Sequence, residues 1–474
     1  MAETRAVLVG GSLAGMCAAR VLGDFFDRIT VIERDAYPEG VDDRPGVPQG
    51  RGIHNLLIRG RREYELHFPG FEQRMRDRGA NEAEFGVNMA FLSPLGWIPP
   101  RRDFMMPALN GSRALIETTV RDLFRKLPKI ELIERAEVVG LSAVRNGGLR
   151  CAGVKVCPRG AGTSFELKAD LVVDAAGRSS RAGEWLKDIG VAPPEETVID
   201  PLGGYACRWF KLRSDARWPS DWWWSSGAWV WNDPLRASAL VRYENGRWLL
   251  MLAGLNENYP PNKEQEFMSA PARLSSPVIA QMLSLREPVS SVHGHRGLIN
   301  RWRHYERWRP GLRGFIAVAD AACIFNPVFA QGMTVAAVSA SILRNALEKG
   351  GPTNPRLESL FFASQARFQQ EAWRLSVSTD VVLPGTKGPN SRALRLFQRY
   401  REAVTLAARN PSVGRRLVEV MNLLKPCSAL FAPSILLRAA TAQTAVTLAR
   451  LSGHSLIPPA TPMPPPMPEA TSDA

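Results

Sequence analysis

The sequence lacks the features that define several large classes of protein. Its six cysteines form no Cys-x-x-Cys pair and no zinc-finger spacing, so we expect buried free thiols, no redox-active disulfide and no metal site. No stretch approaches the roughly 20 unbroken apolar residues of a membrane-spanning helix. Gly10 and Gly11 interrupt the first apolar run, which argues against a signal peptide and makes a cytoplasmic location the expectation.

The charge balance is basic, but this alone does not predict a nucleic-acid partner. The chain of 474 residues carries a formal net charge of +14, which suits an anionic cofactor, an acidic carrier protein or a membrane surface. Basic and aromatic residues alternate over 301–309, as they do in some proteins that bind single-stranded nucleic acid. This segment runs directly into an apolar strand pattern, so we interpret it as a connector with a cationic exposed side and expect no nucleic-acid partner.

Two segments far apart in the chain share one pattern. Val7–Gly15 and Phe315–Ala322 are each an apolar run with β-branched residues that ends in small residues and leads into a helical pattern. A strand, a tight turn and a helix N-terminus in that order bind a phosphate or a sugar. One such segment suggests a nucleotide. Two suggest a nucleotide with a long extended body, so FAD is the predicted cofactor.

The first segment carries a dinucleotide fingerprint with one departure. Gly10 and Gly15 take the positions that make the tight turn and allow close helix–strand packing, whereas Ser12 takes the position where a glycine admits the pyrophosphate. Glu33 follows the second predicted strand, 28–32, where an acidic residue binds the ribose hydroxyls. The predicted cofactor-binding residues of this βαβ unit are Gly10, Gly11, Ser12, Leu13, Ala14, Gly15, Glu33 and Arg34.

Two later turns extend the predicted site. Asp320 ends a buried strand and is placed to accept hydrogen bonds from the ribityl chain, and Asp174–Arg181 is a polar turn after another strand. The helix after Gln331 offers backbone N–H groups and a positive dipole end to the negative charge of a reduced flavin. The predicted flavin-edge environment is Pro327, Gln331 and Gly332, with no dedicated acid or base; further predicted cofactor contacts are Val138, Asp174, Asp320, Gly332 and Met333.

The order of elements predicts an α/β fold. A Rossmann-like FAD-binding domain (GR2-type) carries an inserted antiparallel β-sheet substrate domain and a helical C-terminal region. Helices are expected over 13–23, from about His54 to His67 and after Gln331, and strands over 149–157 and 164–173. The predicted segments are 1–195, the first part of the FAD-binding domain with substrate-side insertions around 60–110; 196–300, the mostly antiparallel β substrate domain; 301–350, the return of the FAD-binding domain; 351–455, the helical region; and 456–474, a Pro-rich disordered tail.

Several motifs in this order resemble those of one family. The Gly10–Gly15 fingerprint, the Asp174–Arg181 turn and Ala319–Asp320 are similar to the three motifs of the single-component FAD-dependent aromatic hydroxylases. Within that superfamily the chain most resembles the FAD epoxidases of polyether antibiotic biosynthesis, over roughly residues 5–440. It departs from the family in having Ala319 where a glycine is usual and Cys323 where many members have histidine. The segments that carry the epoxidase resemblance are Arg44–Gln49 with Arg51 and His54, Ser112–Leu115 with Val120 and Arg121, Asp170–Asp174 and Phe325–Val328.

The resemblance implies a flavin monooxygenase. NAD(P)H or a partner flavin reductase would reduce FAD, and a flavin hydroperoxide formed with O₂ would epoxidise or hydroxylate an apolar olefinic or polyketide-like small molecule. Arg51 would face the pyrophosphate and Arg113 the ribityl or flavin end. The tryptophan-rich sheet at 205–252 either walls a lipophilic substrate pocket or simply packs the core. His54 is open to a functional or a structural interpretation.

Two other functions stay open at this point. An FAD-dependent reductase, dehydrogenase or halogenase acting on a lipophilic substrate would use a similar architecture, and Gly96–Pro99 resembles an incomplete halogenase motif Trp-x-Trp-x-Ile-Pro. A non-catalytic flavin-fold protein could instead bind lipid or a carrier protein through a basic helical surface, although a solvated helix face explains the same residues. The arginines in question are Arg392, Arg395, Arg399, Arg401, Arg415 and Arg416.

Overall fold

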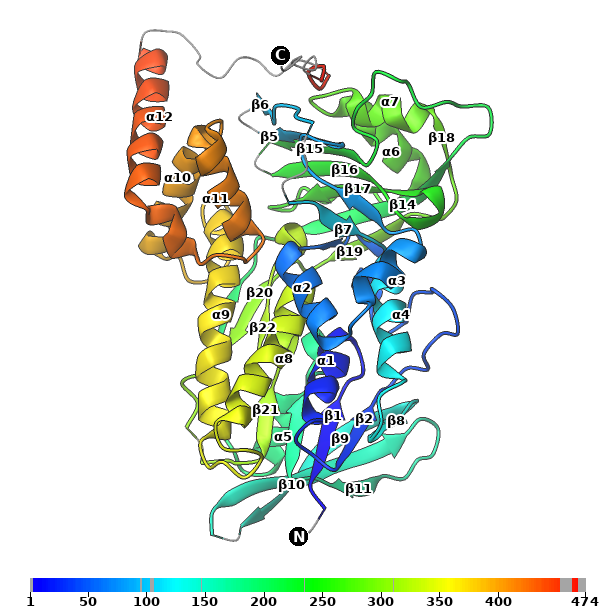
Figure 1. Cartoon of the computed structure of the whole chain (residues 1–474), viewed down its shortest axis with the longest axis vertical. Helices are drawn as coiled ribbons and strands as arrows, with labels where there is room; N and C mark the ends of the chain where they lie inside the picture. The colour runs from blue at the N-terminus through cyan, green and yellow to red at the C-terminus, as the bar shows by residue number, and fades with distance from the viewer. Residues whose placement is uncertain are drawn as a thin grey trace, which may run out of the picture.

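The structure, a computed structural model, describes residues 3–93, 96–102, 106–145, 147–233, 235–309, 311–451 and 463–467. A parallel sheet lies at one end of the molecule, a larger sheet at the other, and a group of C-terminal helices stands beside both (Figure 1). This arrangement confirms the predicted α/β class with a Rossmann-like sheet, antiparallel sheets and C-terminal helices. Within the described ranges, no helix combines the length and apolarity needed to span a bilayer.

The five-stranded sheet is parallel throughout, in the order β21-β12-β1-β2-β8. Its two first strands are runs of apolar and β-branched residues in which every position after the first is buried. Burial of successive residues is typical of parallel strands whose sheet is covered on both faces. The strands are β1 (Arg5–Val9), β2 (Arg28–Ile32), β8 (Ile130–Ile133), β12 (Leu171–Asp174) and β21 (Phe315–Ala317).

Helices cover one side of this sheet and a small antiparallel sheet, β11-β10-β9, lies near its other side. The helix α1 packs against α8, and α2 packs against the same α8. These elements are α1 (Leu13–Leu22), α2 (Ile58–His67), α3 (Phe71–Asp77), α4 (Arg113–Phe124), α5 (Ala182–Asp188), α8 (Gly332–Glu348), β9 (Ala136–Arg145), β10 (Leu149–Pro158) and β11 (Phe165–Lys168).

Two predicted elements differ in the structure. The strand expected over 164–173 is two strands in different sheets, because the chain crosses from β11 to the parallel sheet at Asp170, whose N–H donates to the carbonyl of Arg5 at 2.8 Å. The helix expected from His54 begins only at Ile58, since residues 55–56 pair as a strand with 108–110.

The larger sheet has eight strands, with β19 paired beside β14. It is antiparallel except where β15 pairs in parallel with β5. Helices α6 (Glu264–Ser269) and α7 (Val278–Ser284) pack against one face. The strands are β5 (Met89–Ser93), β6 (Gly96–Trp97), β14 (Gly204–Leu212), β15 (Gly227–Asp233), β16 (Arg236–Arg242), β17 (Arg247–Gly254), β18 (Arg286–Pro288) and β19 (His293–Arg296).

Two further three-stranded sheets join the parts together. The basic and aromatic segment 301–309, expected to be a connector, contributes to a strand whose Trp302 is buried against Trp373. Arg303 in the same strand is buried and pairs with Glu196 at 2.8 Å. The strands are β13 (Glu196–Ile199), β20 (Asn300–Arg303) and β22 (Cys323–Ile324) in one sheet, and β3 (Asn55–Leu56), β4 (Asn81–Ala83) and β7 (Ala108–Asn110) in the other.

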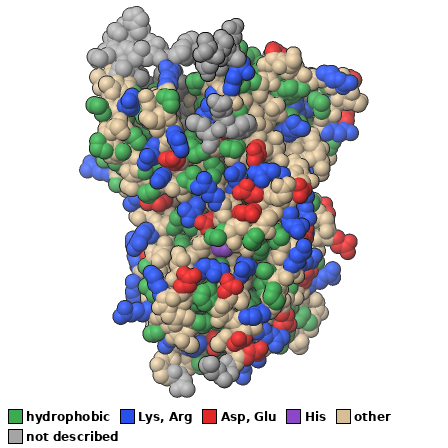
Figure 2. Space-filling model, in the orientation of Figure 1, with side chains coloured by type: hydrophobic (Ala, Val, Ile, Leu, Met, Phe, Trp, Pro, Cys, Tyr) green, Lys and Arg blue, Asp and Glu red, His purple; other side chains and the backbone are tan. Residues whose placement is uncertain are grey.

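The C-terminal helices form a separate core beside the sheets (Figure 1). Of the arginines considered as a basic face, Arg401 is buried, and Arg415 and Arg416 both pair with Glu419. On the face drawn in Figure 2, basic side chains are spread over the surface with acidic ones between them. The helices are α9 (Leu357–Asp380), α10 (Arg392–Ala407), α11 (Pro411–Met421) and α12 (Pro433–Leu451).

Candidate functional site

Three turns that are far apart in the sequence meet at one edge of the parallel sheet. Val9 of β1 is paired with Asp174 of β12, and Asp174 is paired with Ala317 of β21. Because the three strands are parallel and in register, the chain leaves all of them at the same carboxyl edge. Ligands of open α/β sheets bind at that edge. The motifs predicted separately therefore lie together at one edge of the sheet.

The first turn requires glycine at three positions. Gly10 has φ +99°, and a Cβ there would lie 2.7 Å from the carbonyl oxygen of Ala175. A Cβ on Gly15 would lie 1.9 Å from the carbonyl oxygen of Gly10, and one on Gly11 would lie 2.2 Å from the hydroxyl of Tyr37. The first turn thus packs against α1 and against the end of β12 with no room for a side chain between them, which is the close packing that the glycines of the fingerprint allow.

Glu33 connects this turn to a buried cluster of charges. Its carboxylate accepts hydrogen bonds from the N–H of Gly11 at 2.9 Å and of Asp35 at 3.0 Å. Arg44 pairs with Glu33 at 3.2 Å, with Asp35 at 3.5 Å and with Glu117 at 2.5 Å. Burial alone would lower the pKa of Arg44, but the charges of Glu117 and Glu33 outweigh it and raise that pKa. Three buried carboxylates therefore share the Arg44 guanidinium, and Glu117 also pairs with Arg113 at 2.7 Å.

Tyr37 closes the same cluster from the side of the first turn. Its hydroxyl donates a hydrogen bond to the carbonyl of Gly11, and Arg44 lies 5.0 Å from its ring centroid. Burial, and then the nearby Glu33, raise the pKa of the Tyr37 hydroxyl, which therefore stays a donor at neutral pH.

The helix α4 brings a second guanidinium to the fingerprint. Ser112 caps the helix by accepting from the N–H of Leu115 at 3.1 Å. Arg113, at the first position of the helix, donates to the hydroxyl of Ser12 at 2.7 Å and pairs with Glu117 at 2.7 Å. Ser12, which stands where the fingerprint usually has glycine, is thus bonded to Arg113, a residue predicted to face the cofactor.

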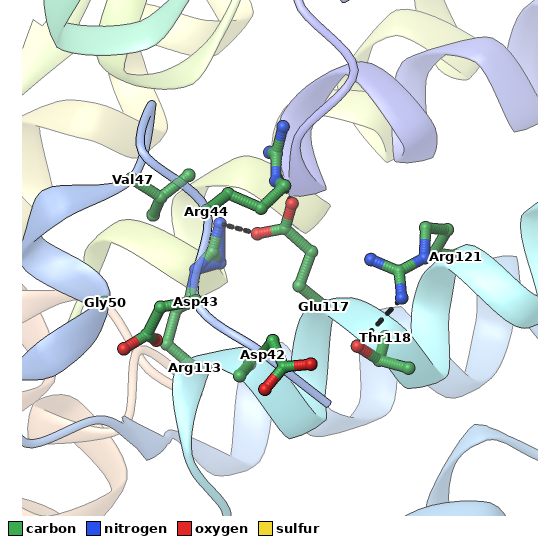
Figure 3. Close-up of a pocket in the computed structure, with 10 residues that line it drawn as sticks. Asp42, Asp43, Arg44, Val47, Gly50, Arg113, Glu117, Thr118 and Arg121 are labelled. Carbon is green, nitrogen blue, oxygen red and sulfur yellow. Dashed lines mark hydrogen bonds and ion pairs between the residues drawn. The ribbon is translucent and has the colours of Figure 1, made fainter. Parts of the chain in front are cut away.

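A loop partly covers this part of the site. Figure 3 shows Glu117 projecting from α4 toward Arg44, which comes from the loop Asp42–Gly50. The cavity between the loop and α4 has a volume of about 10 Å³, room for a single water molecule. The loop is thus packed closely against α4.

The second turn is held by its own aspartate. Asp174 is fully buried and accepts from the N–H of Ala176 at 3.0 Å and from the hydroxyl of Ser180 at 2.5 Å. Burial raises the pKa of its carboxyl, and these two hydrogen bonds oppose the rise. Asp174 therefore shapes the turn between β12 and α5, and a ligand would meet the turn's backbone before this side chain.

The third turn carries Asp320 on a strained backbone. Ala319, where the resembled family has glycine, has φ +50°. Gln365 of α9 holds the chain on the N-terminal side of this residue, donating to the carbonyl of Ala317 at 2.9 Å and accepting from the N–H of Ala319 at 3.3 Å. Burial raises the pKa of the Asp320 carboxyl against the opposing charges of Arg178 and Arg113.

Beside Asp320, the N-terminus of α8 has unfilled hydrogen-bonding capacity. A Cβ on Gly332 would lie 3.7 Å from a carboxylate oxygen of Asp320. Gln331 is 1% exposed, and within the described part of the chain neither its amide nitrogen nor its amide oxygen has a hydrogen-bond partner; the hydroxyl of Thr334 has none either. Buried polar groups are normally bonded, so these atoms are suited to a polar ligand.

A buried polar network holds the loop that leads into α8. Asp380 at the end of α9 accepts from the side-chain amides of Asn300 at 2.6 Å and Asn326 at 3.2 Å. The carbonyl oxygen of the Asn300 side chain in turn accepts from the N–H of Asn326 at 2.8 Å and from the hydroxyl of Ser376 at 2.7 Å. Asn326 precedes Pro327, so this network fixes where the predicted flavin-edge segment begins.

Other predicted residues lie outside this arrangement. The side chain of Arg51 is 51% exposed, 3.8 Å from Asp43. Arg34 is exposed and donates to the carbonyl of Gly46 at 3.3 Å. Val138 is buried in the main core. Leu13 and Ala14 form the first turn of α1, and Met333 that of α8, where its carbonyl accepts from the hydroxyl of Tyr64 at 3.0 Å.

His54 lies between the first turn and the larger sheet. Its Nδ1 is 3.0 Å from the carbonyl oxygen of Gly52, and its backbone N–H donates to the hydroxyl of Tyr243 at 2.9 Å. Burial, and then the charge of Arg113, lower the pKa of His54 to about 4. The imidazole is therefore neutral at pH 7, with Nδ1 as the donor to Gly52.

The larger sheet has two apolar faces, and the tryptophans are divided between them. Alternate residues of a strand point to opposite faces. The inner face packs against Ile53 and Phe85 and includes Trp209 and Trp229. The outer face packs against α6 and α7 and includes Trp97, Trp218, Trp222, Trp223, Trp224 and Trp248.

The residues that sequence reasoning missed share one property. Each of them is bonded to a residue distant in the sequence. They are Arg44, Tyr37, Glu117, Gln365 and Asp380. Arg44 was within a recognised motif, Arg44–Gln49, yet its surroundings depend on α4. No local pattern marks Gln365 or Asp380, which read as ordinary helix residues.

The glycine turn, Glu33 and the unbonded atoms of Gln331 fit the chemistry of FAD. Among solved structures, the chain is similar to the flavin-dependent brominase Bmp2, with a TM-score of 0.64 and 14% identity over 95% of this chain and 100% of that one. It is also similar to the anhydrotetracycline hydroxylase OxyS from Streptomyces rimosus, with a TM-score of 0.59 and 18% identity over 90% of this chain and 76% of that one. The fold is that of the flavin-dependent oxidoreductases that include hydroxylases and halogenases.

A curated relative identifies the family. No protein-family model matches the sequence. Protein Rv3254 of Mycobacterium tuberculosis is 32% identical over 355 residues, which cover 73% of this chain and 73% of that protein. The chain belongs to the family of Rv3254.

Proposed function

We propose that this protein is an FAD-dependent monooxygenase that acts on an apolar small molecule, with epoxidation of an olefin as the preferred reaction and hydroxylation as the next. The observation that carries the proposal is the register of Val9, Asp174 and Ala317, which brings three nucleotide-type turns to one edge of a parallel sheet. An extended dinucleotide is the ligand whose length matches several turns along such an edge.

The residues of the three turns divide the work of binding. The backbone of Gly10–Gly15 and the N-terminus of α1 suit the pyrophosphate, and Glu33 suits the ribose hydroxyls. Arg113 with Ser12 would bind toward the middle of the cofactor, and Asp320 the ribityl chain. The start of α8, with Gln331 and Gly332, would lie at the flavin edge. When bound, FAD supplies electron transfer and the activation of O₂, and NAD(P)H or a partner reductase is the proposed electron donor.

The inner face of the larger sheet supports a lipophilic substrate. Phe85, Phe91, Trp209 and Met251 are only partly buried there and pack against the buried apolar residues of that face. The Tyr243 hydroxyl, which accepts from the N–H of His54 and donates to its carbonyl, joins the same face to the segment around His54. An apolar wall beside the predicted flavin would bind a hydrocarbon and exclude water from the reaction.

The position of Trp97 does not support the halogenase alternative. Trp97, in the segment that resembles an incomplete halogenase motif, packs on the outer face with α6 and α7, across the sheet from the inner face. It is therefore not placed to act beside the three turns. A reductase or dehydrogenase would use the same turns and is separated from a monooxygenase only by its products.

A purified-protein experiment tests the proposal in two stages. Flavin content is measured in the full chain and in Gly11→Ala, whose new Cβ would lie 2.2 Å from the Tyr37 hydroxyl and so displace the first turn. Gly183→Ala is the matched control, because a Cβ there meets only Pro193, at 3.8 Å. We expect FAD in the wild type and the control and at least a tenfold loss of FAD affinity in Gly11→Ala. A folded wild-type protein that neither contains nor accepts FAD would refute the proposal.

The second stage identifies the reaction. NADPH, or a reducing partner, is supplied with ¹⁸O₂ and a panel of lipophilic olefins and polyketide rings. Incorporation of one labelled oxygen atom into product supports a monooxygenase, and an epoxide distinguishes the preferred reaction. Saturated product without label would assign a reductase, and halide-dependent product a halogenase.

A further inference from the structure

The outer face of the larger sheet carries a row of indole rings. Trp218 and Trp222 meet edge to face with ring centroids 5.2 Å apart, and Trp222 stacks on Trp224 at 5.3 Å. Trp223 meets Trp224 edge to face at 5.6 Å. The indole N–H of Trp218 donates to the carbonyl of Trp222 at 2.8 Å, which fixes the row from within. We call these four residues the tryptophan ledge.

The floor of the ledge is rigid and cationic. Trp218 stacks on Trp248 at 5.5 Å, and the buried guanidinium of Arg286 lies 3.7 Å from the ring centroid of Trp248. Burial, and then the charge of Arg242, lower the pKa of Arg286 to about 9. A packed floor of this kind keeps the outer indoles in place, so their edges form a preformed surface.

A piece of the C-terminal segment lies on this surface. The indole N–H of Trp223 donates to the carbonyl of Pro465 at 2.9 Å. Pro464 is buried, Met463 packs against the same apolar cluster as the ledge, and Pro466 is exposed. Contact is therefore made by one side of the run Met463–Met467, in which three consecutive prolines stand between two methionines.

We propose that the tryptophan ledge is a docking site for a proline-rich chain and that Met463–Met467 of the same molecule is its occupant. A run of prolines favours the polyproline II conformation and has no backbone N–H of its own, so its carbonyls need donors from a partner. Aromatic rings that pack on prolines, with an indole N–H that bonds a carbonyl, are the features by which proteins recognise such runs. The stiffness of the run also lowers the entropy lost on docking.

Docking joins two parts of the molecule that are far apart in the chain. The ledge lies in the loop between β14 and β15 and packs on the outer face of the larger sheet, whereas Met463–Met467 follows α12 of the C-terminal helices. The ledge also lies on the opposite face of the sheet from Trp209 and Trp229. The segment therefore links the helical region to the outer face of the sheet. Its docking does not require a bound cofactor.

The test uses ¹⁹F NMR of the full chain labelled with 5-fluorotryptophan. Trp223→Phe identifies the Trp223 resonance. Pro464→Gly removes the buried proline, and Pro466→Gly is the matched control, because it loosens the same segment at an exposed position. We expect Pro464→Gly to shift the Trp223 resonance by more than its linewidth toward its solvent-exposed value, and Pro466→Gly to leave it in place.

Three outcomes would overturn the proposal. The first is an unchanged Trp223 resonance in Pro464→Gly, and the second is an equal shift in both variants. The third is a wild-type resonance that changes with protein concentration, because that would assign the ledge to the tail of a second copy. The resonances of Trp185 and Trp373, which lie in other cores, report that each variant stays folded.

A peptide restores the contact if the ledge itself recognises prolines. A synthetic peptide with the sequence of residues 461–468, added to the Pro464→Gly protein, should return the Trp223 resonance to its wild-type position in a saturable way. The same peptide with glycine at the position of Pro464 should require at least a tenfold higher concentration. Equal effects of the two peptides would also refute the proposal.

Discussion

Arg113 donates a hydrogen bond of 2.7 Å to the hydroxyl of Ser12, across 101 positions of sequence. Ser12 stands where the dinucleotide fingerprint usually has glycine, and a side chain there narrows the approach of a pyrophosphate. In this protein the extra group is bonded to a cation that is predicted to face the cofactor. Ser12 and Arg113 therefore act as a pair at the first turn, and changing Arg113 should alter cofactor binding.

Arg113→Met should weaken FAD binding. The variant keeps the length of the side chain but removes the charge-assisted bond to Ser12 and the ion pair with Glu117. In the proposed complex the Arg113 guanidinium also donates to the cofactor; a hydrogen bond to a charged group contributes about 1.5–3 kcal/mol, so its loss should raise the dissociation constant of FAD by roughly 10-fold to 100-fold. Titration of the apoprotein, followed by flavin fluorescence, measures the change.

The control for this variant is Arg125→Met at the other end of the same helix. Arg125 pairs with Glu134 at 3.4 Å, and its side chain is 47% exposed. It should leave FAD affinity within about twofold. Equal losses in the two variants would show that Arg113 acts through net charge rather than through contact with the first turn.

Arg44→Met should destabilise the fold strongly. Arg44 is the shared partner of the buried carboxylates of Glu33, Asp35 and Glu117. Removing one partner of a buried ion pair leaves uncompensated charge and costs about 3–5 kcal/mol. Urea unfolding should show this loss, whereas Arg28→Met, which breaks an exposed pair with Glu131, should change stability by less than about 1 kcal/mol. A small effect of Arg44→Met would mean that the cluster rearranges around the loss.

Asp380 predicts a particular dependence of stability on pH. Burial raises the pKa of its carboxyl to about 7, against the hydrogen bonds from Asn326 and Asn300. Between the ordinary value of 3.8 and about 7, the folded protein keeps a proton that the unfolded chain releases. Stability should therefore fall as pH rises through this window, by up to about 1.4 kcal/mol per pH unit, and level off above it.

Asp380→Asn removes this contribution, because an amide does not ionise. The unfolding free energies of wild type and variant are measured from pH 4.5 to 8. The difference, wild type minus variant, should fall as pH rises and become constant above about pH 7. Asp188→Asn, at an exposed position, is the control. A pH-independent difference for Asp380→Asn would contradict the assignment.

Ala319→Gly should be tolerated or stabilising, although the site is buried. Ala319 has φ +50°, and a left-handed backbone costs an L-residue about 1–2 kcal/mol. Glycine removes this cost, but its greater backbone freedom in the unfolded state offsets about 0.5–1 kcal/mol of the stabilisation. Ala322→Gly is the matched control, since Ala322 is also buried but has φ −102°; it should lose about 1 kcal/mol. Thermal or urea unfolding of the two variants should give changes of opposite sign.

Local patterns predicted much of the fold. The apolar runs of β1 and β2, the glycines between β1 and α1, and the alternation of strand and helix patterns are properties of short segments. The strand predicted over 164–173 was wrong because a change of sheet at Asp170 leaves no mark in the alternation of side chains. The start of α2 was misplaced because residues 55–56 pair with a strand more than fifty positions later.

The sequence by itself determined most of the elements and predicted a type of site, because turns, helix starts and buried strands are encoded in neighbouring residues. Only the tertiary structure decided that Asp174 is paired with both Val9 and Ala317, that Arg44 is surrounded by three carboxylates, and that the tryptophans are divided between two faces of one sheet. Those relationships depend on strand register and on burial by distant segments, which no local pattern specifies.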